Sequence, residues 1–255
     1  MNIKFIGTGS GKSSLKRFHS SILVSTQNSN LLIDCGDSTS RALLKAEIDF
    51  NSINGIIFSH LHPDHFSGLG ELLIQMKMGK RKAQLDISSG KDQVNFIKEY
   101  ILNSYLLHER MNFEIKFYSI ENDSTIQIDS ELKILPRSNN HLAELKSYPQ
   151  YKNLSFDSFS FLISDGKKNL VYTGDVGVPK DLYLFQGNKI DLFISEATHV
   201  SPDEIIIAHK TLNPLKAILT HIPDENERMI LNQIKNFDPK GNKIGLAYDG
   251  LEIQL

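Results

Sequence analysis

The chain has very little cysteine and no tryptophan. Its single cysteine, Cys35, excludes any intrachain disulfide among the 255 residues, so the fold cannot depend on covalent cross-links. Structural disulfides belong to oxidising compartments, and their absence favours a reducing cytoplasm. The segment Met1–Gly7 is expected to be a strand that runs into a glycine loop. It lacks the order of a secretion signal, in which charged residues are followed by a long apolar run and then by small residues.

Long apolar runs and an excess of charge of one sign are also missing. No run approaches the ~20 apolar residues that a membrane-spanning helix requires, so the sequence predicts no membrane partner. The formal net charge is -2, from 28 lysines and arginines against 30 aspartates and glutamates. A charge so close to zero excludes a global basic field for a long polyanion, although local basic patches stay open.

Segments of strand character and of helix character are interleaved along the chain. Strands are expected over the apolar runs Ile3–Ile6, Ser21–Ser25, Leu31–Asp34, Gly55–Ser59, Phe159–Ser164, Leu170–Thr173, Leu192–Ser195, Ala217–Thr220 and Lys243–Ala247. Apolar spacing and capping residues predict helices over Thr39–Ala46, Gly68–Lys77, Lys91–Leu106, Ser201 to about Lys210, and Asp224–Phe237. A tight turn at Asp249–Gly250 is expected to lead into a closing strand.

The order of these segments predicts an α/β fold. Some strands follow one another through hairpins and others are separated by helices, so we expect two packed sheets with helices outside. With 40% hydrophobic residues and no linker or low-complexity tract, the chain is expected to form one domain over residues 1–255. The polar segment Asn139–Asp157 is either a surface loop or a flap, and its Tyr148–Tyr151 either packs within it or stacks a base.

The densest chemical signal is the segment Ser59–His65, which holds three histidines and one aspartate directly after an apolar run. Side chains at the tip of a strand can converge on a metal instead of packing into a core. Imidazole and carboxylate groups suit zinc, and also manganese or iron. A chance cluster of histidines in a polar loop is the alternative interpretation.

The spacing within this segment divides the candidate ligands into two pairs. His60 and His62 can face one ion, while Asp64 and His65 turn toward a second. Two ions ~3.5–4 Å apart can hold a bridging hydroxide and stabilise both the attacking and the leaving oxygens of a displacement.

Three later residues can complete such a site, because each follows an apolar run where a strand gives way to a loop. They are His141, Asp175 and His221. Gly174 is expected to let the backbone come close to a metal, since glycine has no side chain. Taken singly, each of the three residues is explained equally well by a structural role and by metal binding. Their shared position at the ends of strands favours a common metal site.

These residues, in their order along the chain, resemble the motifs of metallo-β-lactamase-fold hydrolases. The matching segments are His60/His62/Asp64/His65, His141, Thr173–Asp175 and Leu219–His221. Further segments resemble motifs of the ribonuclease Z and phosphodiesterase branch of these hydrolases. They are Gly7–Gly11, Arg17, Ser20–Ser21, Leu32–Asp37, Ser195–Thr198 and His199–Ser201. The resemblance covers nearly the whole chain, and it implies an αβ/βα four-layer sandwich with metals at one edge between the sheets.

The resemblance also implies a ligand set and a cofactor. The first metal would be held by His60, His62 and His141, and the second by Asp64, His65 and His221, with Asp175 as the bridge. The implied cofactor is two divalent metal ions, with zinc preferred and manganese or iron as alternatives. An aspartate bridge fits phosphodiester hydrolysis better than β-lactam hydrolysis, for which a cysteine usually stands at that place.

We therefore expect a phosphodiesterase in which a metal-bound hydroxide attacks a small or single-stranded nucleotide phosphodiester. Asp64 would orient the nucleophile. His199 would give a proton to the leaving oxygen, and Glu196 would hold its ring. The alternative for His199 is a surface histidine that merely precedes a capped helix.

Two alternative functions stay open. A ribonuclease Z-type tRNA 3′ endonuclease would usually carry a long basic arm between His141 and Asp175, and this interval is largely filled by two expected strands. RNA remains a possible partner, since Lys77–Lys82 either contacts a nucleic-acid backbone or ends a helix. The second alternative is a non-catalytic nucleotide- or metal-binding protein, against which the complete ligand set argues. A homodimer is left open.

Three basic residues in the first loop are a further candidate for contact with a substrate phosphate. Lys12, Lys16 and Arg17 lie among glycines whose backbone N–H groups can also face an anion. The sequence is equally consistent with a loop whose basic side chains are simply solvated and contact no substrate.

Overall fold

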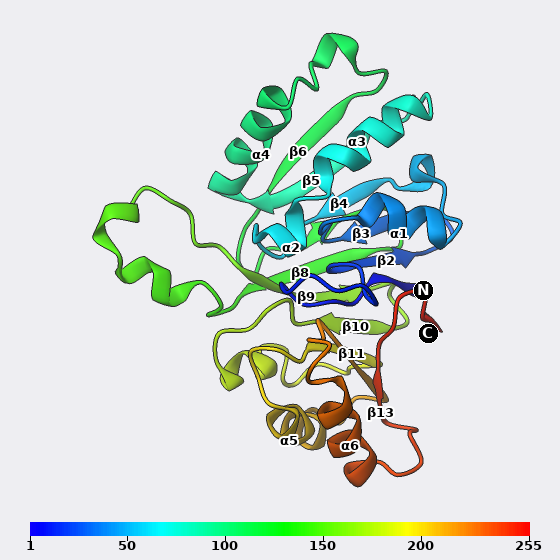
Figure 1. Ribbon diagram of the computed structural model, residues 1–255, viewed down its shortest axis with the longest axis vertical. Helices are drawn as coiled ribbons and strands as arrows, with labels where there is room; N and C mark the ends of the chain where they lie inside the picture. The colour runs from blue at the N-terminus through cyan, green and yellow to red at the C-terminus, as the bar shows by residue number, and fades with distance from the viewer.

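Two sheets, each of seven strands, lie face to face in the computed structural model, which describes residues 1–255 (Figure 1). The first sheet has the order β14 (Glu252–Gln254), β1 (Asn2–Gly7), β2 (Ser21–Ser25), β3 (Asn30–Ile33), β4 (Gly55–Ile57), β5 (Leu85–Gly90) and β6 (Ile115–Ile120). The second has the order β13 (Ile244–Leu246), β12 (Lys216–Thr220), β11 (Leu192–Glu196), β10 (Asn169–Tyr172), β9 (Phe159–Ser164), β8 (Lys133–Ser138) and β7 (Ile126–Gln127).

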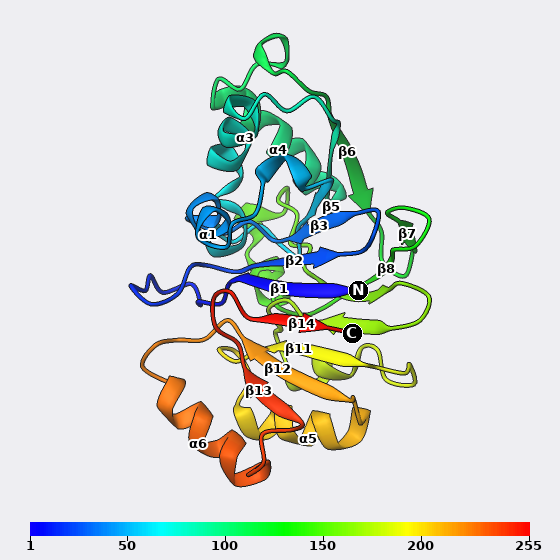
Figure 2. The same ribbon diagram turned by 90° about the vertical axis from the view of Figure 1, so that its right-hand side faces the viewer.

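Helices cover the outer face of each sheet. The first sheet carries α1 (Thr39–Lys45), α2 (Pro63–Phe66), α3 (Leu69–Met78) and α4 (Lys91–Asn103), and the second carries α5 (Pro202–Leu212) and α6 (Glu227–Phe237). Figure 2 shows the two termini side by side, where β14 pairs antiparallel with β1. The predicted αβ/βα sandwich is thus confirmed. None of the helices has the length and apolar character needed to cross a membrane.

Alternation of side chains along the strands builds the three apolar layers. In β1, Ile3 and Phe5 point into the central core between the sheets, whereas Ile6 joins the layer under the outer helices. In β9, Phe161 belongs to the central core and Leu162 to the layer beneath α5 and α6. Because successive side chains of a strand face opposite ways, each sheet buries both of its faces.

Two strands of the first sheet lie outside the predicted strands. β5 has the sequence LDISSG, whose two serines and glycine carry little strand propensity, yet it is paired in parallel with both β4 and β6. β6 is half exposed, and none of its first five residues is fully buried. Tertiary pairing therefore overrides local propensity at this edge.

The ends of some predicted elements also differ in the structure. The last helix begins at Glu227 and not at Asp224, and the side chain of Asp224 accepts a hydrogen bond from the Ser14 hydroxyl. The helix predicted to reach Leu106 ends at Asn103, and Tyr105 has a left-handed backbone with φ 59°. The segment Asn139–Asp157 contains two short 3-10 turns and projects from the edge of the sandwich (Figure 1).

Candidate metal centre

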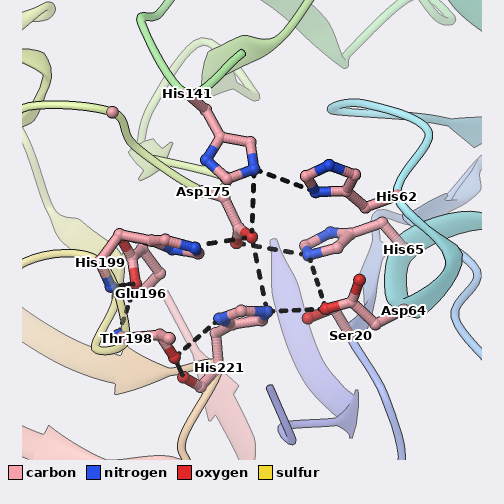
Figure 3. Close-up of polar contacts among 12 residues, drawn as sticks. Ser20, His62, Asp64, His65, His141, Asp175, Glu196, Thr198, His199 and His221 are labelled. Carbon is pink, nitrogen blue, oxygen red and sulfur yellow. Dashed lines mark hydrogen bonds and ion pairs between the residues drawn. The ribbon is translucent and has the colours of Figure 1, made fainter. Parts of the chain in front are cut away.

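Seven candidate ligands meet at one edge of the sandwich, where strands from both sheets end. His60 and His62 follow β4, and Asp64 and His65 lie on the short helix α2 that begins at Pro63. The other three follow strands of the second sheet: His141 after β8, Asp175 after β10 and His221 after β12. Figure 3 shows the rings of His65, His141 and His221 turned toward the Asp175 carboxylate. Residues far apart in sequence converge because the carboxyl ends of parallel strands share one edge.

The first donor group consists of His60, His62, His141 and Asp175. The Nδ1 atom of His62 lies 3.1 Å from His60 Nε2 and 3.1 Å from His141 Nε2. The Asp175 Oδ2 atom lies 3.9 Å from His60 Nε2 and 3.8 Å from His141 Nε2. One ligand atom from each residue lies within 4.8 Å of all the others, which is the spacing of a single ion's first coordination sphere.

The second donor group consists of Asp64, His65, Asp175 and His221. The His221 Nε2 atom lies 3.0 Å from Asp64 Oδ2 and 3.5 Å from Asp175 Oδ2. The His65 Nε2 atom lies 3.3 Å from Asp175 Oδ1. Asp175 therefore belongs to both groups and presents its two oxygens between them.

Two buried polar atoms in this cluster have no hydrogen-bond partner. They are His65 Nε2 and Asp175 Oδ1, and both residues are almost fully inaccessible to solvent. Buried polar groups are nearly always paired, and an orphaned one is costly. A cation held between the donor groups would satisfy both atoms, so the residues present fit divalent metals.

The protonation states of three candidate ligands suit a metal, whereas the charges of Asp175 and Asp34 outweigh burial and raise the pKa of His65 well above its usual value. Burial, reinforced by neighbouring histidines, lowers the pKa of His60 well below its usual value, and burial lowers that of His141 to about 4. Burial opposes the ionisation of Asp64, but the His221 hydrogen bond and the charge of His65 outweigh it and lower the pKa to about 2. Neutral imidazoles and ionised carboxylates are the forms that bind metals.

Asp34 is a candidate positioning residue to which the sequence analysis assigned no role. It follows β3 in a left-handed conformation with φ 59° and lies beneath the cluster. Its Oδ2 atom accepts from His65 Nδ1 at 2.8 Å, from the Tyr172 hydroxyl at 2.8 Å and from the Ser59 hydroxyl at 2.9 Å. A carboxylate that binds the far nitrogen of a ligating imidazole fixes its tautomer and orientation.

The substitution Asp34→Asn is expected to weaken metal binding by ~10–100-fold, the usual cost of losing such an orienting partner. Asparagine tolerates the left-handed backbone, but either orientation of its amide places an NH₂ group against donors. Titration of the metal-free protein against a competing chelator measures the affinity. The control Tyr172→Phe removes one donor, keeps the His65 contact and should change the affinity less. Unchanged affinity in Asp34→Asn would contradict the positioning role.

His199 lies at the open side of the cluster, near Glu196. Its Nδ1 atom is 3.3 Å from Glu196 Oε1 and 3.9 Å from Asp175 Oδ2, and its side chain is 35% exposed. The close Glu196 carboxylate raises the pKa of His199. The other oxygen of Glu196 accepts from the backbone N–H groups of Thr198 and His199, so this carboxylate is fixed in place. A partly exposed imidazole with a raised pKa, beside the candidate ligands, is well placed to act as an acid.

The cluster opens into a pocket of about 400 Å³ whose lining contains no hydrophobic residue. Lys12 lies on its wall, but its ammonium pairs with Glu225 at 2.8 Å. Asn226 lies beside them at the start of α6. Such a polar pocket suits a charged, hydrated group more than an apolar one.

The structure shows the surroundings of three neighbouring residues that the sequence analysis considered. Arg17 is buried and donates to the Thr8 hydroxyl and the Ala247 carbonyl, so it braces the first loop and cannot meet a substrate phosphate. The glycine at position 174 is also required by its φ of 58° and by the Phe159 carbonyl, which a side chain at this position would meet. Arg81, within the basic run, is buried and donates to three backbone carbonyls.

Two mixed sheets enclosed by helices, with a histidine and aspartate cluster at their edge, define a protein of the metallo-β-lactamase fold. Within this class, the family model described as "Anti-Pycsar protein Apyc1" matches residues 1–236, and the chain belongs to that family.

Relatives of known structure and sequence agree with this class. Ribonuclease Z of Methanococcus aeolicus is 27% identical over 217 residues, which is 82% of this chain but only 62% of that protein, so the chain spans less than two thirds of that relative. The metallo-β-lactamase-fold protein YhfI of Bacillus subtilis superposes with a TM-score of 0.79 at 19% identity, covering 99% of this chain and 98% of YhfI. The human short-form tRNase Z superposes with a TM-score of 0.75 at 20% identity, covering 100% and 99%. The structural likenesses show the fold.

Proposed function

We propose that the protein is a binuclear metal-dependent phosphodiesterase that acts on a small or single-stranded nucleotide substrate. One observation carries this proposal: two donor groups share the Asp175 carboxylate and open together into a wholly polar pocket. Two adjacent cation sites suit an in-line displacement at phosphorus, in which charge develops on both the attacking and the leaving oxygens.

The residues divide the work in the proposed reaction. His60, His62 and His141 would hold one ion, Asp64, His65 and His221 the other, and Asp175 both. When bound, zinc or another divalent metal would lower the pKa of water toward ~7 and polarise the phosphoryl oxygens. Asp64 would accept a hydrogen bond from the attacking water and orient it. His199 would give its proton to the leaving oxygen, with Glu196 fixing the ring.

The surface around the pocket supports a small substrate over a folded RNA. The interval between His141 and Asp175 holds the projecting segment and the strands β9 and β10, and the segment itself carries as many acidic as basic residues. In the basic run at the end of α3, Arg81 is turned inward. Because the chain is similar to the ribonuclease Z of Methanococcus aeolicus, tRNA 3′ processing is the second candidate function.

A substrate panel tests the proposed function. Metal-replete protein is assayed on bis-p-nitrophenyl phosphate, cyclic nucleotides, pre-tRNA and a lactone, with the metal content measured on the same sample. We expect hydrolysis of the phosphodiesters. Hydrolysis of the lactone alone, or no hydrolysis by protein that holds its metals, would reject the proposal.

Salt dependence separates the two candidate substrates. A clamp on folded RNA neutralises several phosphates, so its apparent affinity falls steeply as salt rises from ~50 to ~200 mM. With a net charge of -2, the protein is expected to show shallow salt dependence and a kcat/KM on a short strand at least equal to that on pre-tRNA. Competition assays at both salt concentrations measure this. A strong preference for pre-tRNA that salt abolishes would favour the ribonuclease Z function.

A further inference from the structure

A second hollow adjoins the candidate metal centre at His62, which lines both this hollow and the polar pocket. It has a volume of about 310 Å³ and lies between the start of α4 and the projecting segment Asn139–Asp157. Six of its lining residues are apolar: Leu61, Phe96, Leu142, Leu145, Leu154 and Phe156. Its volume is at the small end of the ~300–1,000 Å³ of ligand pockets, which suits one ring system and not a longer strand.

One of the two hollows is polar and the other is mainly apolar, and the sugar-phosphate and the base of a nucleotide differ in the same way. The polar pocket has no hydrophobic lining and contains the candidate ligands, so it suits the phosphodiester and the sugar hydroxyls. A nucleobase has two apolar faces and a polar edge, and it is bound by stacking on apolar and aromatic side chains. Of the two hollows that meet at His62, the one lined by Phe96 and Leu154 provides such walls.

Two apolar side chains of this hollow remain largely accessible to solvent. Phe96 is 51% exposed and Leu154 is 60% exposed, so neither side chain is buried in a hydrophobic core. The Phe96 ring is nevertheless held in place, because it packs against Phe66 at 5.7 Å between ring centroids and against Tyr100 at 6.4 Å. A fixed aromatic ring with a free face is the arrangement on which a planar base stacks.

The end of the projecting segment is anchored to α4, which keeps the hollow formed. Gln93 donates from Nε2 to the Asp157 carbonyl at 2.7 Å, and its Oε1 atom accepts from the Ser89 hydroxyl at 2.8 Å. Two polar side chains at the exposed rim, Asp92 and Asn153, make no side-chain hydrogen bond within the chain and can meet a polar ring edge. An apolar wall with such a rim fits a nucleobase better than a hydrocarbon.

We propose that this hollow binds the base of the nucleotide whose phosphodiester lies at the metal centre. The inference rests on the proposed phosphodiesterase function, and it adds a residue, Phe96, that determines affinity for the base. His62 then forms the boundary between the phosphate-binding part and the base-binding part of one continuous substrate site.

A matched pair of substrates tests the base site: a cyclic nucleotide and its abasic counterpart, which has hydrogen in place of the base. Wild-type kcat/KM is expected to be about 10-fold or more higher on the nucleotide, the usual contribution of one stacked base. In Phe96→Ala and in Leu154→Ala the nucleotide should lose this advantage through a higher KM, while kcat/KM on the abasic substrate stays at the wild-type value. The control Leu102→Ala changes an equally exposed residue of α4 outside the hollow and should keep the preference.

The outcomes distinguish this inference from the function on which it rests. If metal-replete wild type hydrolyses neither substrate, the proposed function fails. If it hydrolyses both with equal kcat/KM, the function stands and the base site is rejected. If the nucleotide is preferred but Phe96→Ala and Leu154→Ala keep that preference, the base binds elsewhere and the inference is overturned. Leu154→Ala keeps the test valid if the loss of the Phe96 ring disturbs α4.

Discussion

Replacement of Asp175 by alanine is expected to abolish hydrolysis and to remove much of the metal from the second donor group. Asp175 is the one residue that belongs to both donor groups, and its two oxygens lie between His65 and His221. Without this carboxylate no anion is shared by the two donor groups. The loss should exceed the ~10²–10³-fold that removal of one preorganised electrostatic group costs. Metal analysis of the purified proteins and initial rates measure both effects.

A second buried aspartate provides the control for this substitution. Asp191 is 1% exposed, pairs with Lys168 at 3.0 Å and lies at the opposite end of β11 from Glu196. Asp191→Ala should lower the thermal stability but leave the metal content per folded chain at about two ions, the wild-type expectation for a two-metal site. Only trace metal in replete wild type would refute the site itself. Full metal content and activity in Asp175→Ala would refute the bridging role.

Replacement of His199 by alanine is expected to leave the metals in place and to slow the reaction selectively. His199 lies outside the two donor groups that share Asp175, although its Nδ1 atom is 3.9 Å from Asp175 Oδ2. On a diester with a poor, alkoxide leaving group the rate should fall by ~10²–10⁴-fold, the usual contribution of a general acid. On a p-nitrophenyl ester it should fall far less, because that leaving group scarcely needs a proton.

The comparison of the two substrates decides the role of His199. His108 is an exposed histidine remote from the cluster, so His108→Ala should change neither rate. Equal losses of His199→Ala on both substrates would show that the imidazole positions the substrate or stabilises the site, and not that it gives up a proton. A loss of metal would assign it to the ligands, an outcome that its proximity to Glu196 and His221 makes worth measuring.

Much of the fold and of the cluster could be predicted because the signals are local. An apolar run followed by polar residues marks the end of a strand, and His60, His141 and His221 each stand at such an end. Strands that end at one edge bring their following residues together, so convergence of the ligands needed no knowledge of exact distances. Similarly, the capping box of Ser201 and Glu204 placed the start of α5 correctly.

Other features could not be predicted, because they depend on contacts between distant parts of the chain. Asp34 meets Tyr172 across 138 positions, and Arg17 meets the Ala247 carbonyl across 230. A buried arginine that braces a loop and a basic residue that awaits a phosphate look alike in a sequence. Only the packing of the two sheets decides which of them Arg17 is.

The sequence by itself determined the ligand types, their order and the class of fold, since each is written in neighbouring residues and in the period of the apolar pattern. The tertiary structure alone decided the distances among the candidate ligands around Asp175, which carboxylate orients His65, and where an apolar hollow meets the polar pocket at His62. The physical reason is that distances and shared cavities arise from the packing of α4, the projecting segment and both sheets, and no local propensity encodes that packing.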